Sequence, residues 1–228
     1  MYQLQIIPRT LHFKQPAGTS RGIYTTRRVW YLLLTDTVSR RYGVGECAPL
    51  HAGSLQLWAT PFSEGRQGIP INGLIWMGNF DEMYQRIEEK MKAGFRCIKL
   101  KIGAIDFERE LELLSHIRKH FSPEQIELRV DANGAFSPED APRKLEQLNE
   151  FQLHSIEQPI RAGQWQAMKQ LCATTPFPIA LDEELIGINE RERKIELLDT
   201  IRPQYIILKP SLHGGIQGSQ EWITLAAE

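Results

Sequence analysis

Five short β-prone runs in this chain each end in a charged side chain, and these ends recur at intervals of 25 to 30 residues. The charged residues are Lys101, Asp131, Glu157, Asp182 and Lys209. Each interval has room for one strand, one helix and their loops. Such βα alternation predicts an α/β fold with a parallel sheet and right-handed crossovers. The five side chains would then lie at the C-terminal ends of neighbouring strands, where α/β proteins carry their active sites.

The alternation begins near Gly68, and the segment boundaries follow from apolar spacing, glycines and helix-start residues. We expect six strands, over 71–77, 96–102, 126–130, 153–156, 179–181 and 205–208. We expect helices over 81–92, 107–120, 165–173 and 190–200, and one that starts with Ser137 as its N-cap and runs to about residue 150. Spacing alone is compatible with a doubly wound sheet and with a closed barrel.

The first fifty residues have a different pattern. β-prone runs over 4–7, 29–35 and 41–46, punctuated by glycines, predict an antiparallel meander. The segment Gly18–Gly22 is expected to be a mobile loop between two of these strands. We therefore divide the chain into an N-terminal domain over 1–67 and a βα domain over 68–228.

Charge and composition argue against several classes of protein. The chain of 228 residues has 27 Lys and Arg against 28 Asp and Glu, so it has no net basic charge to attract nucleic acid or an anionic membrane. No apolar run reaches the roughly 18 residues that span a bilayer, and the N-terminus lacks a signal-peptide pattern. Cys47, Cys97 and Cys172 form no CxxC pair, which favours a reducing cytoplasm.

The residue types at the strand ends indicate a particular chemistry. Asp131, Glu157 and Asp182 would bring three carboxylates together, and like charges at close range need compensation. A divalent cation supplies it, and an all-oxygen ligand set suits Mg²⁺. In an eight-stranded barrel Lys101 and Lys209 would face each other across that cation. A metal between two amines suits removal of a proton from the carbon next to a carboxylate.

The same residues carry a resemblance to a known family. The motifs are Lys99-Leu100-Lys101, Asp131-Ala132-Asn133, Glu157-Gln158-Pro159, Asp182-Glu183 and Lys209-Pro210. In these motifs the chain resembles the muconate-lactonizing subgroup of the enolase superfamily. The resemblance covers nearly the whole chain. It implies a TIM-type (β/α) barrel, modified by the absence of its last strands, preceded by an α+β capping domain.

The resemblance also implies roles for individual residues. Asp131, Glu157 and Asp182 correspond to Mg²⁺ ligands, with Mn²⁺ as a possible substitute. Lys101 corresponds to the acid/base, Lys209 to the lysine on the opposite face, and Lys99 to the neighbour that tunes the base. The residues that support the ligands would be Asn133 and Glu183. The candidate substrate-binding residues are Thr19, Ser20, Arg21, Ser211, Gly214 and Gly215. For the last two we favour a tight βα turn over a cradle for an anion.

Two stretches narrow the resemblance further. The run from Ile71 to Gly78 and the run from Lys209 to Gly215 are similar to the o-succinylbenzoate synthases, in particular those of the Bacteroidetes type. This similarity implies syn-dehydration of 2-succinyl-6-hydroxy-2,4-cyclohexadiene-1-carboxylate (SHCHC) to 2-succinylbenzoate, in menaquinone biosynthesis. The implied partner is a small carboxylate substrate, with no nucleic acid and no membrane. The sequence does not decide the oligomeric state.

Other functions of the same subgroup stay open. Two opposed lysines would also serve a dipeptide epimerase, an N-succinylamino-acid racemase or a cycloisomerase. A non-catalytic relative is less favoured, because nothing would then keep all five charged residues in place.

The chain departs from the family pattern in two places. The helices of the capping domain do not follow Leu50, and barrel strands 7 and 8 do not follow Glu228. Six strands cannot close such a barrel. We therefore expect that the sequence joins the ordered parts of a longer chain, and we favour this over a truncated or degenerate protein. A mass near 26 kDa for the intact protein would contradict that expectation.

Overall fold

The computed structural model describes residues 2–19, 22–38, 42–46 and 71–228. The chain forms two compact units, Met1–Leu57 and Trp58–Glu228. The predicted domain boundary, between residues 67 and 68, lies outside the described residues.

The first unit contains a three-stranded sheet in the order β1-β2-β3. Its strands are β1 (Tyr2–Thr19), β2 (Gly22–Asp36) and β3 (Tyr42–Glu46). Both pairings are antiparallel, which confirms the predicted meander. The strands are longer than predicted, because the β1–β2 ladder continues past a register shift after His12 and ends with Thr19 opposite Gly22.

The second unit is built on a parallel sheet of six strands in sequence order, β4-β5-β6-β7-β8-β9. The strands are β4 (Gly73–Ile75), β5 (Cys97–Lys101), β6 (Glu127–Asp131), β7 (Ser155–Glu157), β8 (Ile179–Leu181) and β9 (Tyr205–Ile206). Each strand pairs with its successor, as in a barrel, whereas a doubly wound sheet reverses its strand order. The predicted parallel α/β sheet is confirmed, and it forms part of a barrel.

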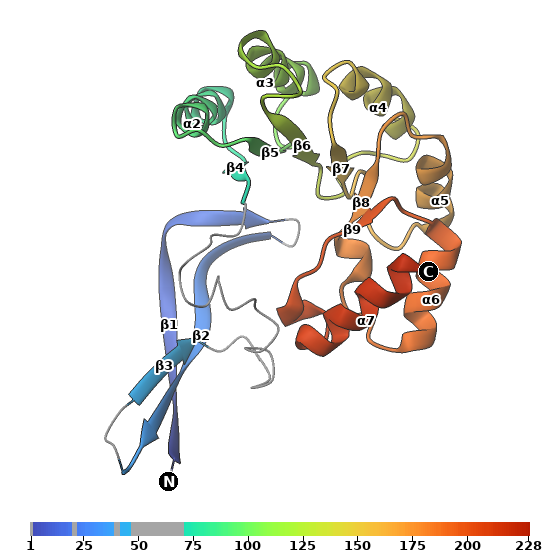
Figure 1. Cartoon of the computed structure of the whole chain (residues 1–228). Helices are drawn as coiled ribbons and strands as arrows, with labels where there is room; N and C mark the ends of the chain where they lie inside the picture. The colour runs from blue at the N-terminus through green and yellow to red at the C-terminus, as the bar shows by residue number, and fades with distance from the viewer. Residues whose placement is uncertain (1, 20–21, 39–41, 47–70) are drawn as a thin grey trace. The chain divides into compact units, whose positions relative to one another are not determined.

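Helices connect the strands and cover one side of the sheet. They are α2 (Phe80–Lys92), α3 (Phe107–His120), α4 (Ala141–Asn149), α5 (Trp165–Thr174), α6 (Arg191–Ile201) and α7 (Gly215–Ala227), with the short 3₁₀ helices η2 (Glu183–Leu185) and η3 (Pro210–Leu212). Figure 1 shows α2, α3, α4 and α5 along the outer side of the curved row of strands. No helix in the described part of the chain has both the length and the apolar character needed to cross a bilayer.

Alternation along the strands separates the core from the site. In β5, Ile98 and Leu100 are fully buried, and they belong to the same apolar cluster as the buried faces of the helices. The side chains of Cys97, Lys99 and Lys101 alternate with them and are only partly buried, because successive residues of a strand point to opposite sides of the sheet. Packing of the helices on the outer face therefore directs both lysines to the inner face.

One predicted helix start is wrong. The helix that was expected to begin after Ser137 begins at Ala141, with Asp140 as its N-cap residue. The Ser137 hydroxyl accepts the N–H of Asp140 (3.1 Å), and its carbonyl accepts the N–H of Ala141 (2.9 Å). Ser137 thus caps a separate turn, and Pro142 occupies the first turn of α4.

Candidate active site

The sheet register places three charged residues side by side. Lys101, the last residue of β5, lies opposite Asp131 on β6, and Asp131 lies opposite Glu157 on β7. Asp131 is fully buried, and Glu157 is nearly so. Strand pairing alone therefore brings together residues that are 26 to 30 positions apart in the sequence.

Asp182 and Lys209 extend this row. Glu157 lies opposite Ala180 on β8, and Asp182 follows Ala180 by two residues, so its side chain falls on the same face. Lys209, beyond the end of β9, donates a hydrogen bond to Oδ2 of Asp182. Asp182 is fully buried, and its Oδ1 has no hydrogen-bond partner among the described residues.

Lys99 bridges two carboxylates that lie close to each other. Its Nζ donates to Glu157 and lies 3.0 Å from Oδ2 of Asp131. Burial opposes the charged form of Lys99, yet the two carboxylates raise its pKa above the ordinary value. Burial by itself would also raise the pKa of Asp131, but Lys99 and Lys101 hold it below the ordinary value. Burial and the charge of Asp131 raise the pKa of Glu157 to about 7.

Asn133 connects the predicted base to the next loop. Lys101 Nζ donates to Asp131 Oδ2 (2.6 Å) and to Asn133 Oδ1 (2.7 Å). The amide of Asn133 donates to Glu183 Oε1 at 2.9 Å. The backbone of Asn133 has φ of +46°, in the left-handed region that asparagine tolerates. The structure thus joins Asn133 and Glu183 to Lys101 by hydrogen bonds.

Trp76 was not singled out from the sequence. Lys101 Nζ lies over its ring, 5.6 Å from the centroid, within the range of a cation–π contact. Arg86 on α2 donates to the carbonyls of Trp76 (2.9 Å) and Met77 (3.0 Å), and so fixes the loop that carries the ring. The available signal was a tryptophan near the end of the predicted strand 71–77.

His213 supports the backbone at Lys209, a role that was not predicted from the sequence. It is fully buried, and its Nδ1 accepts the backbone N–H of Lys209 at 3.0 Å. Burial lowers the pKa of His213, which favours the neutral ring. Its contact fixes the backbone that presents Lys209 to Asp182.

The expected meeting of three carboxylates at one point is not what the structure shows. Within the ranges that the structure describes, no three His, Cys, Asp or Glu side chains lie close enough together to hold a metal ion. Lysine ammonium groups pair with the carboxylates instead, and they offset part of the repulsion between the negative charges. The donor set still fits Mg²⁺, because the row contains three buried carboxylates, and Asp182 Oδ1 has no hydrogen-bond partner in the part of the chain that the structure describes.

The predicted substrate-binding residues are only partly described. Ser20 and Arg21 lie outside the described residues, and Thr19 is the last residue of β1. The expected loop is shorter than Gly18–Gly22, since Gly18 and Thr19 pair with β2. The other three candidates follow Lys209: Ser211 in η3, Gly214 as the N-cap of α7 and Gly215 as its first residue. Both glycines have positive φ, consistent with the tight turn that we favoured.

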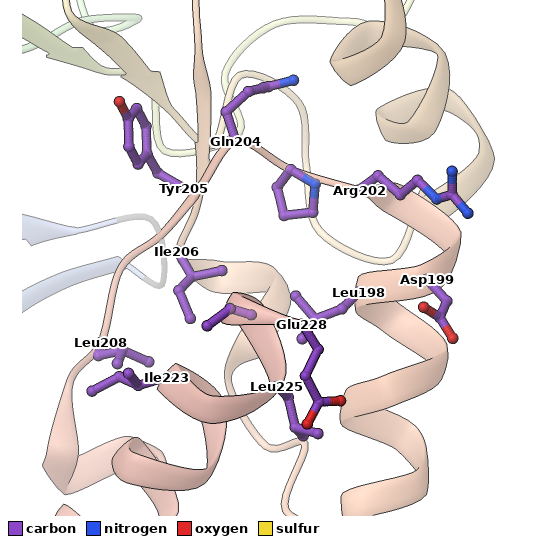
Figure 2. Close-up of a pocket in the computed structure, with 13 residues that line it drawn as sticks. Leu198, Asp199, Arg202, Gln204, Tyr205, Ile206, Leu208, Ile223, Leu225 and Glu228 are labelled. Carbon is purple, nitrogen blue, oxygen red and sulfur yellow. The ribbon is translucent and has the colours of Figure 1, made fainter.

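A cavity of about 640 Å³ lies away from these residues. Figure 2 shows it between the end of α6, strand β9 and the end of α7, with Leu198, Tyr205, Ile206 and Ile223 among its lining residues. None of the charged residues at the strand ends lines it. We therefore place the candidate site at the strand ends and not in this cavity.

Comparisons with known proteins agree with the fold and the motifs. The chain is 57% identical over 180 residues to the o-succinylbenzoate synthase of Desulfotalea psychrophila, which covers 78% of this chain and 49% of that protein. It is 32% identical over 151 residues to the L-Ala-D/L-Glu epimerase of Francisella tularensis subsp. novicida, covering 65% of this chain and 41% of that protein. This chain thus spans about half the length of the curated relatives that it matches.

A solved structure and a family model extend the match. The crystal structure of MenC from Desulfotalea psychrophila LSv54 superposes with a TM-score of 0.78 and 35% identity, over 99% of this chain and 83% of that one. The family model described as "Enolase C-terminal domain-like" matches residues 82–228, which include every strand-end residue discussed above. The chain belongs to the enolase superfamily, by its enolase C-terminal domain-like part.

Proposed function

We propose that the protein is a Mg²⁺-dependent lyase that converts SHCHC to 2-succinylbenzoate by syn-dehydration, in menaquinone biosynthesis. The observation that carries this proposal is the row Lys101, Asp131, Glu157 and Asp182, set by strand register and continued by Lys209. The 57% identity to an o-succinylbenzoate synthase supports this substrate over others of the superfamily.

In the proposed reaction Lys101 acts first as base and then as acid. Its neutral amine takes the proton from the carbon next to the substrate carboxylate, and the resulting ammonium returns a proton to the leaving hydroxyl. The C–H and C–O bonds break, a C=C bond forms, and water leaves. One amine suffices, because in a syn elimination both groups leave from the same face.

The carboxylates would bind the cation, and the other lysines would balance negative charge in the site. Asp131, Glu157 and Asp182 would hold Mg²⁺, for which Mn²⁺ can substitute. When bound, the cation would stabilise the enediolate charge that develops on the substrate carboxylate. Lys209 would add positive charge from the far side of the site, and Lys99 would offset the negative charge of Asp131 and Glu157. Asn133 would hold Lys101 at the correct place, and Glu183 would hold Asn133.

The remaining predictions are part of the same proposal. Thr19, Ser20 and Arg21, together with Ser211, Gly214 and Gly215, would contact the substrate, with Arg21 drawn to a carboxylate. The domains would be residues 1–67 and 68–228. The cytoplasm would be the compartment, which the free thiols of Cys97 and Cys172 support.

Epimerisation of a dipeptide is the second candidate. It is favoured by lysines at both ends of the row and by the 32% identity to an L-Ala-D/L-Glu epimerase. Each lysine would then handle the proton on one face of the substrate carbon. The much higher identity to the synthase favours dehydration.

Both candidates can be tested in one experiment. The protein is incubated with SHCHC or with L-Ala-L-Glu, in Mg²⁺ and in EDTA. We expect 2-succinylbenzoate to form in the presence of Mg²⁺. Its formation should stop in EDTA and resume when Mg²⁺ is restored. Turnover of the dipeptide without any dehydration of SHCHC would instead select the epimerase.

A further inference from the structure

Gln158 makes four side-chain hydrogen bonds next to the proposed cation ligands, and no role has been assigned to it above. Its side chain is fully buried. Oε1 accepts the backbone N–H groups of Asp182 and Glu184, both at 3.2 Å. Nε2 donates to the Ile160 carbonyl at 3.0 Å and to Glu184 Oε2 at 3.2 Å. One amide thus joins the loop after β7 to the loop after β8.

The backbone of Gln158 directs this amide toward Asp182. The residue directly follows Glu157, and its φ of +42° lies in the left-handed region that non-glycine residues rarely occupy. Its own N–H donates to the Ala180 carbonyl at 2.9 Å, which continues the β7–β8 ladder. Oε1 of its side chain accepts the backbone N–H of Asp182, which lies two residues after Ala180. Such a backbone conformation persists only where its surroundings hold it.

Glu184 holds the other side of the amide. It is nearly fully buried, and its Oε1 accepts the N–H of Gly163 at 2.8 Å, while Oε2 accepts from Gln158. Because Nε2 donates to this carboxylate, Oε1 of Gln158 must face the N–H groups of Asp182 and Glu184. The orientation of the amide is therefore set by its partners.

We propose that Gln158 is a positioning residue for the cation site: it fixes Asp182 relative to Glu157, so that both carboxylates serve one divalent ion. This inference rests on the proposed Mg²⁺ site. The backbone N–H of Asp182 donates to Gln158 and its Oδ2 accepts from Lys209, whereas Oδ1 has no hydrogen-bond partner within the described ranges of the chain. Residues behind metal ligands typically change metal affinity 10- to 100-fold when they are lost.

A purely structural role would predict a different outcome. In that case loss of the amide would lower the melting temperature, but the affinity of the folded protein for Mg²⁺ would stay the same. The chain offers a matched control in Gln204, whose side chain is more exposed but also joins two backbone segments. Its Oε1 accepts the N–H of Ile179 and its Nε2 donates to the carbonyl of Cys172, both at 2.9 Å. Ile179 starts β8, whereas Asp182 follows its end.

The experiment compares Gln158→Met with Gln204→Met, by calorimetric titration of the metal-free protein with MgCl₂ and by thermal unfolding in EDTA. Methionine keeps the length of glutamine and removes its hydrogen bonds. We expect both variants to melt a few degrees below the unaltered protein. We expect Gln158→Met to raise the Kd for Mg²⁺ by about 10- to 100-fold, and Gln204→Met to leave it within about twofold.

A second variant covers the case in which Gln158→Met does not fold. Glu184→Gln keeps the packing but has one acceptor oxygen where Glu184 has two, so it cannot accept from both Gly163 and Gln158, and the hydrogen bonding that orients the Gln158 amide is weakened. We expect its Kd for Mg²⁺ to rise about 3- to 10-fold, as a partial form of the same loss.

The outcomes separate this inference from the proposed function. Unchanged Mg²⁺ affinity in Gln158→Met, or in Glu184→Gln where the first does not fold, overturns the positioning role and leaves the site intact. Equal loss of Mg²⁺ affinity in Gln158→Met and Gln204→Met overturns the positioning role as well, since a general destabilisation of the fold would explain both results. If the unaltered protein binds no Mg²⁺, the proposed function fails and this inference fails with it.

Discussion

Lys101 and Lys209 have different surroundings, and this difference supports the different roles that we propose for them. The side chain of Lys101 is 12% exposed and contacts Asp131, Asn133 and the ring of Trp76. The side chain of Lys209 is 44% exposed, and the contact that the structure gives its Nζ is with Asp182. A base must stay in one place relative to the bond that it breaks. We therefore assign proton transfer to Lys101 and charge stabilisation to Lys209.

Alanine variants at these two positions should both lose activity, for different reasons. Lys101→Ala should lower kcat for SHCHC dehydration by about 10²- to 10⁴-fold, because the proton has no acceptor. Lys209→Ala should also lower kcat sharply, because charge in the transition state loses a partner. Substrate binding should survive better than turnover in Lys101→Ala.

Exchange of the substrate's α-hydrogen with solvent deuterium, followed by NMR, separates the two roles. We expect exchange to be lost in Lys101→Ala and to be detectable in Lys209→Ala. The assignment is reversed if Lys101→Ala still exchanges this hydrogen while Lys209→Ala does not.

Glu110 on α3 is a buried carboxyl group outside the row of charged residues. It is 1% exposed, and its Oε1 accepts the N–H groups of Gly103 (2.6 Å) and Ala104 (3.3 Å), in the loop after Lys101. Burial raises the pKa of Glu110 to about 7, although the backbone N–H groups oppose the shift. The folded protein therefore binds this proton more tightly than the unfolded chain does.

This difference makes stability depend on pH in a defined window. Between pH 4.5 and about 7 the unfolded state has lost the proton and the folded state still holds it. The free energy of unfolding should therefore fall as pH rises through this window, by on the order of 3 kcal/mol from this group. Below this pH window the contribution of Glu110 to the free energy of unfolding is constant. Above the window the destabilisation by Glu110 is complete.

Replacing the carboxyl group should remove that slope. We expect urea unfolding of Glu110→Gln to show a smaller loss of stability between pH 4.5 and 7 than the unaltered protein. Glu112→Gln, at an exposed position on the same helix, is the control and should keep the original slope. Equal slopes for Glu110→Gln and the unaltered protein would exclude Glu110 as the source.

At the scale of elements, two loops that carry site residues touch at Gly103. This glycine follows Lys101 by two residues and has φ of +89°. A Cβ atom there would lie 2.3 Å from the Cβ of Ala135, in the loop after Asn133. The close approach keeps the loops after β5 and β6 together, and with them Lys101 and Asn133.

Gly103→Ala should therefore lower the free energy of unfolding by more than backbone strain alone would. Gly187 is a suitable control, because its φ of +86° is nearly the same and a Cβ there would meet nothing within 4 Å. We expect Gly187→Ala to lose about 1–2 kcal/mol from backbone strain. Gly103→Ala should lose a further 1–3 kcal/mol or so from the clash, and should also lower kcat. Chemical denaturation and turnover of SHCHC measure both, and equal losses in the two variants would contradict the proposed contact.

Element order could be predicted from the sequence more completely than element ends. The six parallel strands and the helix Phe107–His120 follow from apolar spacing, which tertiary packing did not override. The start of α4 was misplaced, because Ser137 has the properties of an N-cap but caps a separate turn. Strand β9 ends at Ile206, so that Lys209 lies three residues beyond it and not directly at its end. Leu74, in the middle of the apolar run that was predicted as the first strand, is 38% exposed.

For the molecule as a whole, the sequence predicts which charged residues lie in one row at the strand ends, but not that lysines pair with the carboxylates in that row. Apolar runs precede Asp131, Glu157 and Asp182 in the sequence. The register of the parallel strands then places these three residues next to one another. The pairing of each carboxylate with a lysine depends on side-chain positions that spacing does not specify. The bond from Gln158 to Asp182 spans 24 residues and depends on the β7–β8 register together with an unusual φ. No local pattern indicates it.

The central claim is that three strand-end carboxylates hold one divalent cation. Calorimetric titration of the metal-free protein with MgCl₂ tests it most directly, with Asp131→Asn, Glu157→Gln and Asp182→Asn as variants. The account predicts one Mg²⁺ per chain in the unaltered protein, which Mn²⁺ can replace. It also predicts a strong loss of affinity in Asp182→Asn, because Oδ1 of Asp182 is a buried oxygen without a hydrogen-bond partner among the described residues. Unchanged affinity in all three variants would contradict it.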